Sequence, residues 1–130
     1  MNKISYIPTS KQIGDYFEAY AKLWLAYRGF VIIQSNFNIP KTGEIDIIAC
    51  QLKKPTAVLV FIEVRARKKS NYANANQSII ASKQHRLQNT AEYFLQQHPK
   101  YAKLPCRFDA IVFNYDKKQN IGAEWLENIF

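Results

Sequence analysis

The chain has 130 residues, the length of one ordinary domain, and we expect residues 1–130 to form a single domain. Its composition, 48% hydrophobic and 14% aromatic, excludes an intrinsically disordered protein. The formal net charge of +8 favours a polyanionic partner such as nucleic acid, although a generically basic protein would carry the same charge.

The sequence also argues against a secreted, a membrane-spanning or a zinc-binding protein. No stretch has the apolar length of a signal peptide or a membrane-spanning helix, so we expect a cytoplasmic protein without a membrane partner. Cys50 and Cys106 are too few and too far apart for a zinc site. Both are expected to be buried, reduced thiols.

The first predicted element is a helix that ends at about Arg28, with Gly29 as its stop signal. Thr9 or Ser10 can cap its start. Glu18 lies at the edge of the apolar stripe of this helix. That stripe comprises Ile13, Phe17, Tyr20, Ala21 and Trp24.

Strands are predicted at residues 30–37, 43–49, 57–65 and 107–115, with a short strand or terminal segment at 124–130. A basic and Asn/Ala-rich loop leads from the third strand to a second helix over 77–97. We expect the second and third strands to be antiparallel. The second helix allows the fourth strand to join the sheet in parallel.

Carboxylates lie on two otherwise apolar strands. Because a strand alternates its faces, Glu44 and Asp46 share one face, and Glu63 and Arg65 share a face of the next strand. The opposite face of the first of these strands is predicted to hold Ile45, Ile47 and Ala49.

The pairing of these strands decides whether the carboxylates meet. If Cys50 pairs with Ala57, Asp46 and Glu63 become diagonal neighbours with Cα atoms roughly 7–8 Å apart. Two like charges that close require a divalent cation or a raised pKa. The alternative is that both carboxylates lie on the solvated face of an amphipathic sheet.

Two basic residues are candidates for pairing with carboxylates. Arg107 and Asp109 are expected to form a structural ion pair at the edge of the sheet. Lys83 can either reach Glu63 or extend to solvent. It shares a helical stripe with Ile80, Leu87, Ala91 and Phe94.

An acidic residue on the first helix, Glu18, with Asp46 on the second strand and Glu63-Val64-Arg65 on the third, resembles the PD-(D/E)XK nuclease superfamily. Over nearly its whole length the chain is similar to the YraN family of bacterial proteins. The resemblance implies an α/β fold with a restriction-endonuclease-like three-layer core, in which helices flank a mixed central sheet. It is carried by Gly14–Glu18, Gly43–Ala49, Phe61–Arg67, Ser82–Leu87, Cys106–Asp109 and Trp125–Phe130.

The resemblance also implies a metal site. Asp46 and Glu63 would bind Mg²⁺ or Mn²⁺, with Glu18 as a further acidic group at the site. In the superfamily a lysine two residues after the Glu assists catalysis. Here Arg65 stands in that position, and a guanidinium holds its proton and cannot act as a base. Lys83 could fill the vacant role.

The activity that the resemblance implies is metal-dependent hydrolysis of phosphodiester bonds in DNA. Branched or single-stranded intermediates of repair, recombination or DNA uptake are the expected substrates, and RNA is an alternative. Arg67, Lys68, Lys69 and Arg86 would contact the phosphate backbone. Symmetric cleavage of a junction would require a homodimer. The competing hypothesis is a non-catalytic nucleic-acid-binding or adaptor module that retains the nuclease fold.

Overall fold

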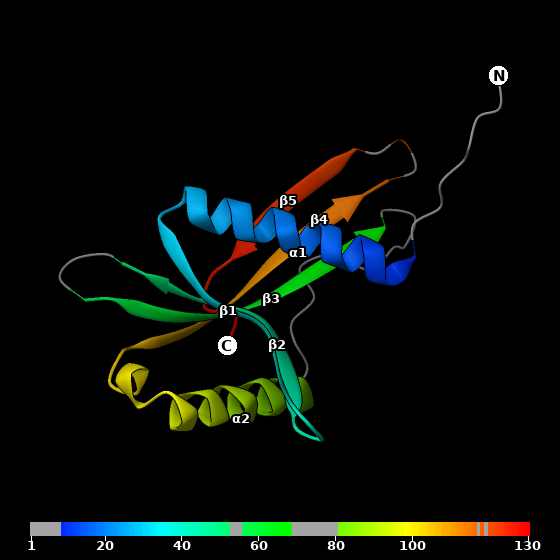
Figure 1. Ribbon diagram of the computed structural model, residues 1–130. Coiled ribbons are helices and arrows are strands. Elements are labelled where there is room, and N and C mark those ends of the chain that lie inside the picture. Colours follow the sequence, from blue (N-terminus) through cyan, green and yellow to red (C-terminus); the bar gives the residue numbers. More distant parts are fainter. Residues whose placement is uncertain (1–8, 53–55, 69–80, 117, 119) are drawn as a thin grey trace.

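The computed structural model describes residues 9–52, 56–68, 81–116, 118 and 120–130. These form three layers, with one helix on each face of a five-stranded mixed sheet (Figure 1). The restriction-endonuclease-like α/β fold class predicted from the sequence is confirmed. In chain order the elements are α1 (Ser10–Tyr27), β1 (Phe30–Ile39), β2 (Gly43–Gln51), β3 (Val58–Lys68), α2 (Ala81–Gln97), the 3₁₀ turn η1 (Pro99–Tyr101), β4 (Cys106–Tyr115) and β5 (Ile121–Leu126).

The ends of α1 follow its predicted signals. Thr9 and Gln12 form a capping box, in which the Gln12 N–H donates to the Thr9 hydroxyl at 3.1 Å. Gly29 follows the helix at φ +86°, a conformation that favours glycine. The buried stripe differs from the prediction, because Tyr20 is exposed and the fully buried Leu25 takes its place.

Strands β2, β3 and β4 pair in the predicted directions. The sheet order is β1-β2-β3-β4-β5, with β1–β2 and β2–β3 antiparallel and β3–β4 parallel through the crossover by α2. A fifth strand, β5, pairs antiparallel with β4. The terminal segment, for which the sequence left two alternatives, therefore begins as a strand.

The register of β2 and β3 differs by two residues from the prediction. Cys50 pairs with Leu59 and not with Ala57, and the last pair of the ladder is Ile47 with Ile62. One step further along, Asp46 and Glu63 lie opposite each other rather than diagonally. The side-chain parity is unchanged because the shift is an even number of residues.

The β1–β2 hairpin bends toward α2 near Asp46. Ile47 and Ala49 pack in the core beneath α1, whereas Ile45 packs in the core beneath α2, so the prediction that all three share one face is wrong for Ile45. The end of the hairpin reaches the start of α2 (Figure 1). There a Cβ on Gly43 would lie 2.7 Å from the Thr90 hydroxyl oxygen and 3.3 Å from the Arg86 carbonyl oxygen.

Asp109 is a fully buried carboxylate on β4. It accepts hydrogen bonds of 2.9 Å from Nε and Nη2 of Arg107, from Nε1 of Trp125 and from the backbone N–H of Asn128. The predicted ion pair with Arg107 is confirmed. Its predicted place at the sheet edge is wrong, because β4 lies between β3 and β5.

The two cysteines lie in different environments. Cys50 is buried, as expected, but Cys106 is exposed, so the expectation of two buried thiols is wrong for Cys106; neither forms a disulfide. Burial raises the pKa of the Cys50 thiol. Neither helix in the described ranges is long and apolar enough to cross a membrane.

Candidate metal and phosphate site

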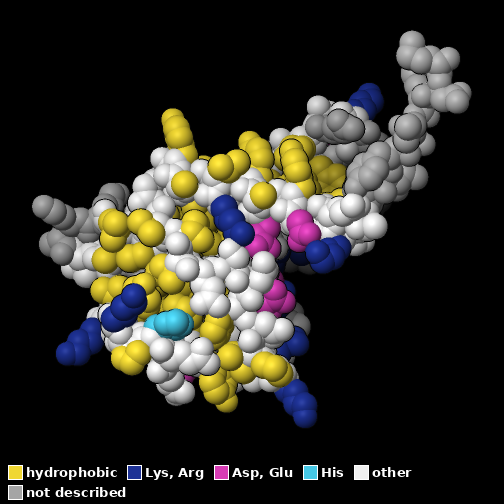
Figure 2. Space-filling model, in the orientation of Figure 1, with side chains coloured by type: hydrophobic (Ala, Val, Ile, Leu, Met, Phe, Trp, Pro, Cys, Tyr) yellow, Lys and Arg dark blue, Asp and Glu magenta, His cyan; other side chains and the backbone are white. Residues whose placement is uncertain are grey.

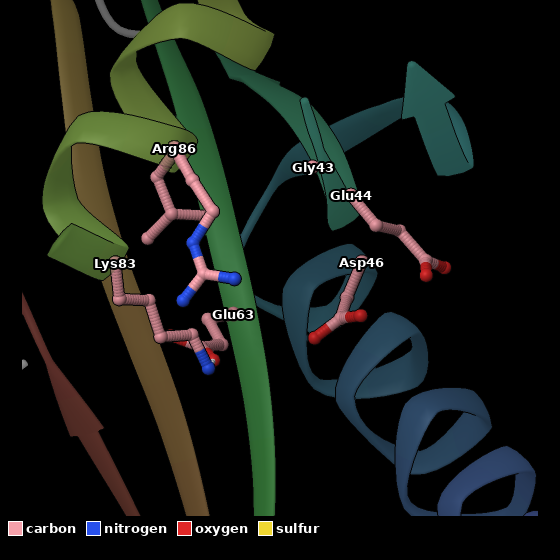
Figure 3. A pocket seen from close by; sticks show the side chains of 7 residues that line it. Gly43, Glu44, Asp46, Glu63, Lys83 and Arg86 are labelled. Carbon is pink, nitrogen blue, oxygen red and sulfur yellow. Dashed lines mark ion pairs between the residues drawn. The ribbon is translucent and has the colours of Figure 1, made fainter. Parts of the chain in front are cut away.

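A pocket of about 310 Å³ opens where the end of the β1–β2 hairpin meets α2. Acidic side chains gather between α1 and α2 with Lys and Arg side chains around them (Figure 2). In the close view, Lys83 and Arg86 extend from α2 toward Glu63, and Asp46 lies across the gap on β2 (Figure 3). The pocket is lined by Gly43, Glu44, Asp46, Glu63, Lys83, Arg86 and Leu87.

Asp46 lies just past the end of the β2–β3 ladder. Its Oδ2 accepts a hydrogen bond of 2.8 Å from the backbone N–H of Val64. Burial raises the pKa of Asp46 to about 6, and the charges of Glu63, Glu18 and Glu44 add to this effect, against the Val64 hydrogen bond. The raised pKa is one of the two outcomes that the sequence required for closely placed carboxylates.

Glu63 forms ion pairs with two basic side chains. Its Oε1 forms an ion pair with Nζ of Lys83, and its Oε2 lies 3.3 Å from Nη2 of Arg65. The Glu63 side chain is 11% exposed and that of Lys83 is 43% exposed, so Lys83 contacts Glu63 while still facing the pocket. Of the two alternatives for Lys83, the structure therefore has the contact with Glu63.

Glu18 lies behind Asp46 on α1 and does not line the pocket. Its Oε1 accepts a hydrogen bond of 3.0 Å from Nδ2 of Asn36, and Nζ of Lys22 is 3.4 Å away. Its charge is one of those that raise the pKa of Asp46, after burial and the charge of Glu63. Sequence reasoning missed Asn36, because it stands among the polar residues Gln34, Ser35 and Asn38 of β1 and nothing in that pattern distinguishes it.

The basic residues predicted to contact phosphates are spread along two elements. Arg86 lines the pocket, whereas Arg67 and Lys68 are the last residues of β3 and lie outside its lining. Lys69 lies outside the described residues. The structure therefore brings together Asp46, Glu63, Arg65, Lys83 and Arg86, with Glu18 adjacent.

The chemistry of the pocket suits a divalent cation. Asp46 and Glu63 offer carboxylate oxygens from neighbouring strands, and the pKa of Asp46 is raised first by burial and then by the neighbouring carboxylates, both of which a bound cation would offset. Within the described ranges, no group of three or more His, Cys, Asp or Glu side chains is arranged to hold a metal ion. A cation at this pair would thus keep several water ligands, as Mg²⁺ commonly does.

Comparison with known proteins assigns a family. The model of "Uncharacterised protein family UPF0102" matches residues 17–113. The chain is 40% identical over 117 residues to a UPF0102 protein of Psychrobacter arcticus, covering 90% of this chain and 67% of that protein.

Two further relatives match more of their own length. A UPF0102 protein of Methylobacillus flagellatus is 41% identical over 120 residues, 92% of this chain and 97% of the relative. One of Francisella tularensis is 41% identical over 119 residues, 92% of this chain and 94% of the relative. These names state no activity. The UPF0102 family corresponds to the YraN proteins that the sequence resembles. The chain belongs to the UPF0102 family.

Proposed function

We propose that this protein is a metal-dependent endonuclease that hydrolyses phosphodiester bonds in DNA. The observation that carries the proposal is the placement of Asp46 opposite Glu63 at one pocket, with Lys83 and Arg65 on Glu63. Carboxylates beside cations in an open pocket are the combination that a phosphodiester and its hydrated metal ion require.

Asp46 and Glu63 would hold Mg²⁺ or Mn²⁺. When bound, such a cation would lower the pKa of a coordinated water and neutralise charge that develops on the phosphate. Because Asp46 has a pKa of about 6, it is mostly ionised and ready to bind at neutral pH, and a bound proton competes with the cation below that pH.

Lys83 and Arg65 would act on the phosphate from the Glu63 side. Lys83 is partly exposed at the pocket and carries three N–H donors, of which Glu63 needs only one. It can therefore also donate to a phosphate oxygen on which negative charge increases. Arg65 keeps its proton and can bind phosphate but cannot act as a base.

DNA is the proposed partner because of the net charge of +8 and the position of Arg86 in the pocket lining. Arg67, Lys68 and Lys69 would extend the contact along the backbone beyond the pocket. RNA is the alternative substrate, since a fold of this kind does not determine which sugar is recognised.

A non-catalytic DNA-binding or adaptor module is the second candidate. One observation favours it, because both oxygens of Glu63 already contact cationic side chains, Lys83 and Arg65. A carboxylate neutralised in this way has less need of a metal ion. The arginine at position 65, where the superfamily has lysine, points in the same direction.

A homodimer forms part of the endonuclease proposal, because symmetric cleavage of a junction needs two sites. The outer face of α1 offers a surface for the second copy, since exposed apolar side chains recur there at steps of four, three and four residues. This is the spacing of a helix–helix seam. The residues are Tyr16, Tyr20, Leu23 and Tyr27.

Sedimentation equilibrium tests the dimer. Leu23→Glu should convert a dimer into a monomer, whereas Tyr93→Glu, which also charges an exposed apolar position but on α2, should leave it intact. A wild-type monomer at every protein concentration would remove the dimer and leave the endonuclease proposal to the cleavage assay.

The deciding experiment is incubation of the purified protein with linear, single-stranded, flapped and four-way-junction DNA in Mg²⁺, Mn²⁺ or EDTA. Cleavage that needs the metal and disappears in Glu63→Gln would support the endonuclease. Glu124→Gln, which removes an exposed carboxylate on β5, is the matched control and should cleave normally. Salt-sensitive DNA binding without cleavage in any metal would favour the adaptor.

A further inference from the structure

We infer that Asn36 is a positioning residue that fixes the carboxylate of Glu18 beside Asp46 and so makes Glu18 part of the cation site. The inference rests on the proposed function, since it concerns the metal ion that Asp46 and Glu63 would hold. It adds a residue to the site that is not itself charged and that contacts no phosphate.

The backbone of Asn36 is unusual for a strand. Its φ is +52°, in the left-handed region, although it lies inside the ten-residue strand β1. A left-handed conformation is unfavourable for residues other than glycine, and asparagine is one of those that tolerate it best. A cost of this kind persists where the surrounding contacts require the conformation, and such positions cluster at functional sites.

The register of β1 and β2 places Asn36 across from Asp46. The neighbouring pairs are Ser35 with Ile47 and Phe37 with Ile45, and Asn36 and Asp46 lie between them on their respective strands. The register is regular here, since the irregularity of this ladder lies between Ile32 and Gln34, so the positive-φ residue of β1 faces the residue of β2 that carries the site carboxylate. It is also at this level that the hairpin bends toward α2.

The side chain of Asn36 links this position to α1. Its Nδ2 donates to Oε1 of Glu18 at 3.0 Å, and Nζ of Lys22 approaches the same oxygen at 3.4 Å. The two donors come from different elements and restrict the Glu18 carboxylate, whose side chain is only 13% exposed. Lys22 offsets part of the charge of Glu18, whereas the neutral amide of Asn36 orients it and leaves its charge available to a cation.

Glu18 would then contribute negative charge, through a water ligand rather than by direct contact, to a cation held by Asp46 and Glu63. Hard divalent cations bind more tightly as carboxylates are added, and groups that orient a ligand from behind commonly change metal affinity by about 10- to 100-fold. Loss of the Asn36 amide should therefore weaken metal binding even though Asn36 touches no metal.

The test is a Mn²⁺ titration followed by electron paramagnetic resonance of the free ion, with wild type, Asn36→Gly, Glu18→Gln and the double variant. Glycine accommodates φ +52° without strain, so Asn36→Gly removes the amide and spares the fold. We expect Mn²⁺ affinity to fall about tenfold or more in each single variant. The double variant should bind no more weakly than Glu18→Gln alone, because both changes act through one carboxylate.

Asn38→Gly is the matched control, an exposed asparagine of the same strand that does not have a positive φ. Asn38→Gly should destabilise the protein more than Asn36→Gly does, yet leave Mn²⁺ affinity unchanged. If Asn36 had only a structural role, the loss of Mn²⁺ affinity would instead follow the loss of stability. Wild-type affinity in Asn36→Gly, or effects of Asn36→Gly and Glu18→Gln that add in full, would overturn the inference. Absence of Mn²⁺ binding in the wild type would instead overturn the proposed metal site itself.

Discussion

Asp109 and Asp46 are carboxylates on inner strands of the same sheet, and they differ in what surrounds them. Asp109 is completely buried and accepts four hydrogen bonds, two of them from the guanidinium of Arg107. This pairing raises the pKa of Arg107. In the described part of the chain, Asp46 accepts one hydrogen bond, from Val64, and its pKa is raised to about 6.

The difference shows that burial does not by itself separate a structural carboxylate from a functional one. Asp109 has a full set of donors and a matched cation, so its negative charge is neutralised within the protein. Asp46 faces other carboxylates instead, so its charge is left to be neutralised by a proton or a bound cation. Substitutions at these two residues and at the cations around the pocket can break or sharpen this contrast.

The largest effect is expected from Asp109→Ala. The substitution removes the hydrogen-bonded partner of the mostly buried Arg107, which keeps only a longer ion pair with Glu127 at 3.9 Å among the described residues, and it removes the acceptor for Trp125 and Asn128. Breaking such a pair typically costs about 3–5 kcal/mol of unfolding free energy, measurable by urea denaturation. Asp15→Asn, which removes a carboxylate from an exposed pair with Lys11, should change stability by less than about 1 kcal/mol. Similar losses in both variants would contradict the structural role of Asp109.

Asp46→Asn is expected to stabilise the protein at high pH. A carboxyl group whose pKa rises from 3.8 unfolded to about 6 folded holds its proton better in the folded state, so stability falls as the pH rises through this window. The asparagine variant escapes this loss, which amounts to at most about 3 kcal/mol at pH 8. Urea denaturation should show a higher unfolding free energy for Asp46→Asn than for wild type at pH 8, and no difference between them below pH 4. A variant less stable than wild type at pH 8 would contradict the contrast with Asp109.

Lys83→Met tests the basic side chain that faces Asp46 across the pocket. If the protein cleaves DNA, loss of this ammonium should slow cleavage by about a hundredfold, the scale of one positioned transition-state donor. DNA affinity should change little, and the methionine stem preserves the packing of Lys83 on α2. Wild-type cleavage by Lys83→Met combined with inactivity of Arg65→Ala would transfer the role to the arginine.

The smallest effect concerns the basic residues predicted to contact the DNA backbone beyond the pocket. Replacing Arg67, Lys68 and Lys69 by alanine should reduce the dependence of DNA affinity on salt, by roughly one unit of slope for each phosphate that the variant no longer neutralises. Fluorescence anisotropy at several salt concentrations measures the slope. A slope unchanged in the triple variant would move the DNA-binding surface elsewhere.

Much of the fold was predictable because local signals and global packing agree. The cap at Thr9, the stop at Gly29 and the alternation of the strands all lead to the observed elements. For Lys83 the helical period left two alternatives, contact with Glu63 or extension to solvent, and the structure has the contact.

The errors arise where geometry depends on backbone features that hydropathy does not encode. The register of β2 on β3 depends on the length and shape of their connection, so the sequence pattern settled its parity but not its shift. The bend near Asn36 and Asp46 coincides with a left-handed residue, and Ile45 packs in the opposite core from Ile47. Because Asn36 was missed, so was the hydrogen bond that holds Glu18.

The close approach at Gly43 also determines the width of the pocket. The hairpin bearing Asp46 rests against α2 at Thr90 and the carbonyl of Arg86, and the Thr90 hydroxyl is already committed to that carbonyl at 2.6 Å. A side chain at position 43 would push the hairpin and the helix apart. The absence of a Cβ at Gly43 therefore allows the acidic side chains of β2 and the basic side chains of α2 to line one narrow pocket.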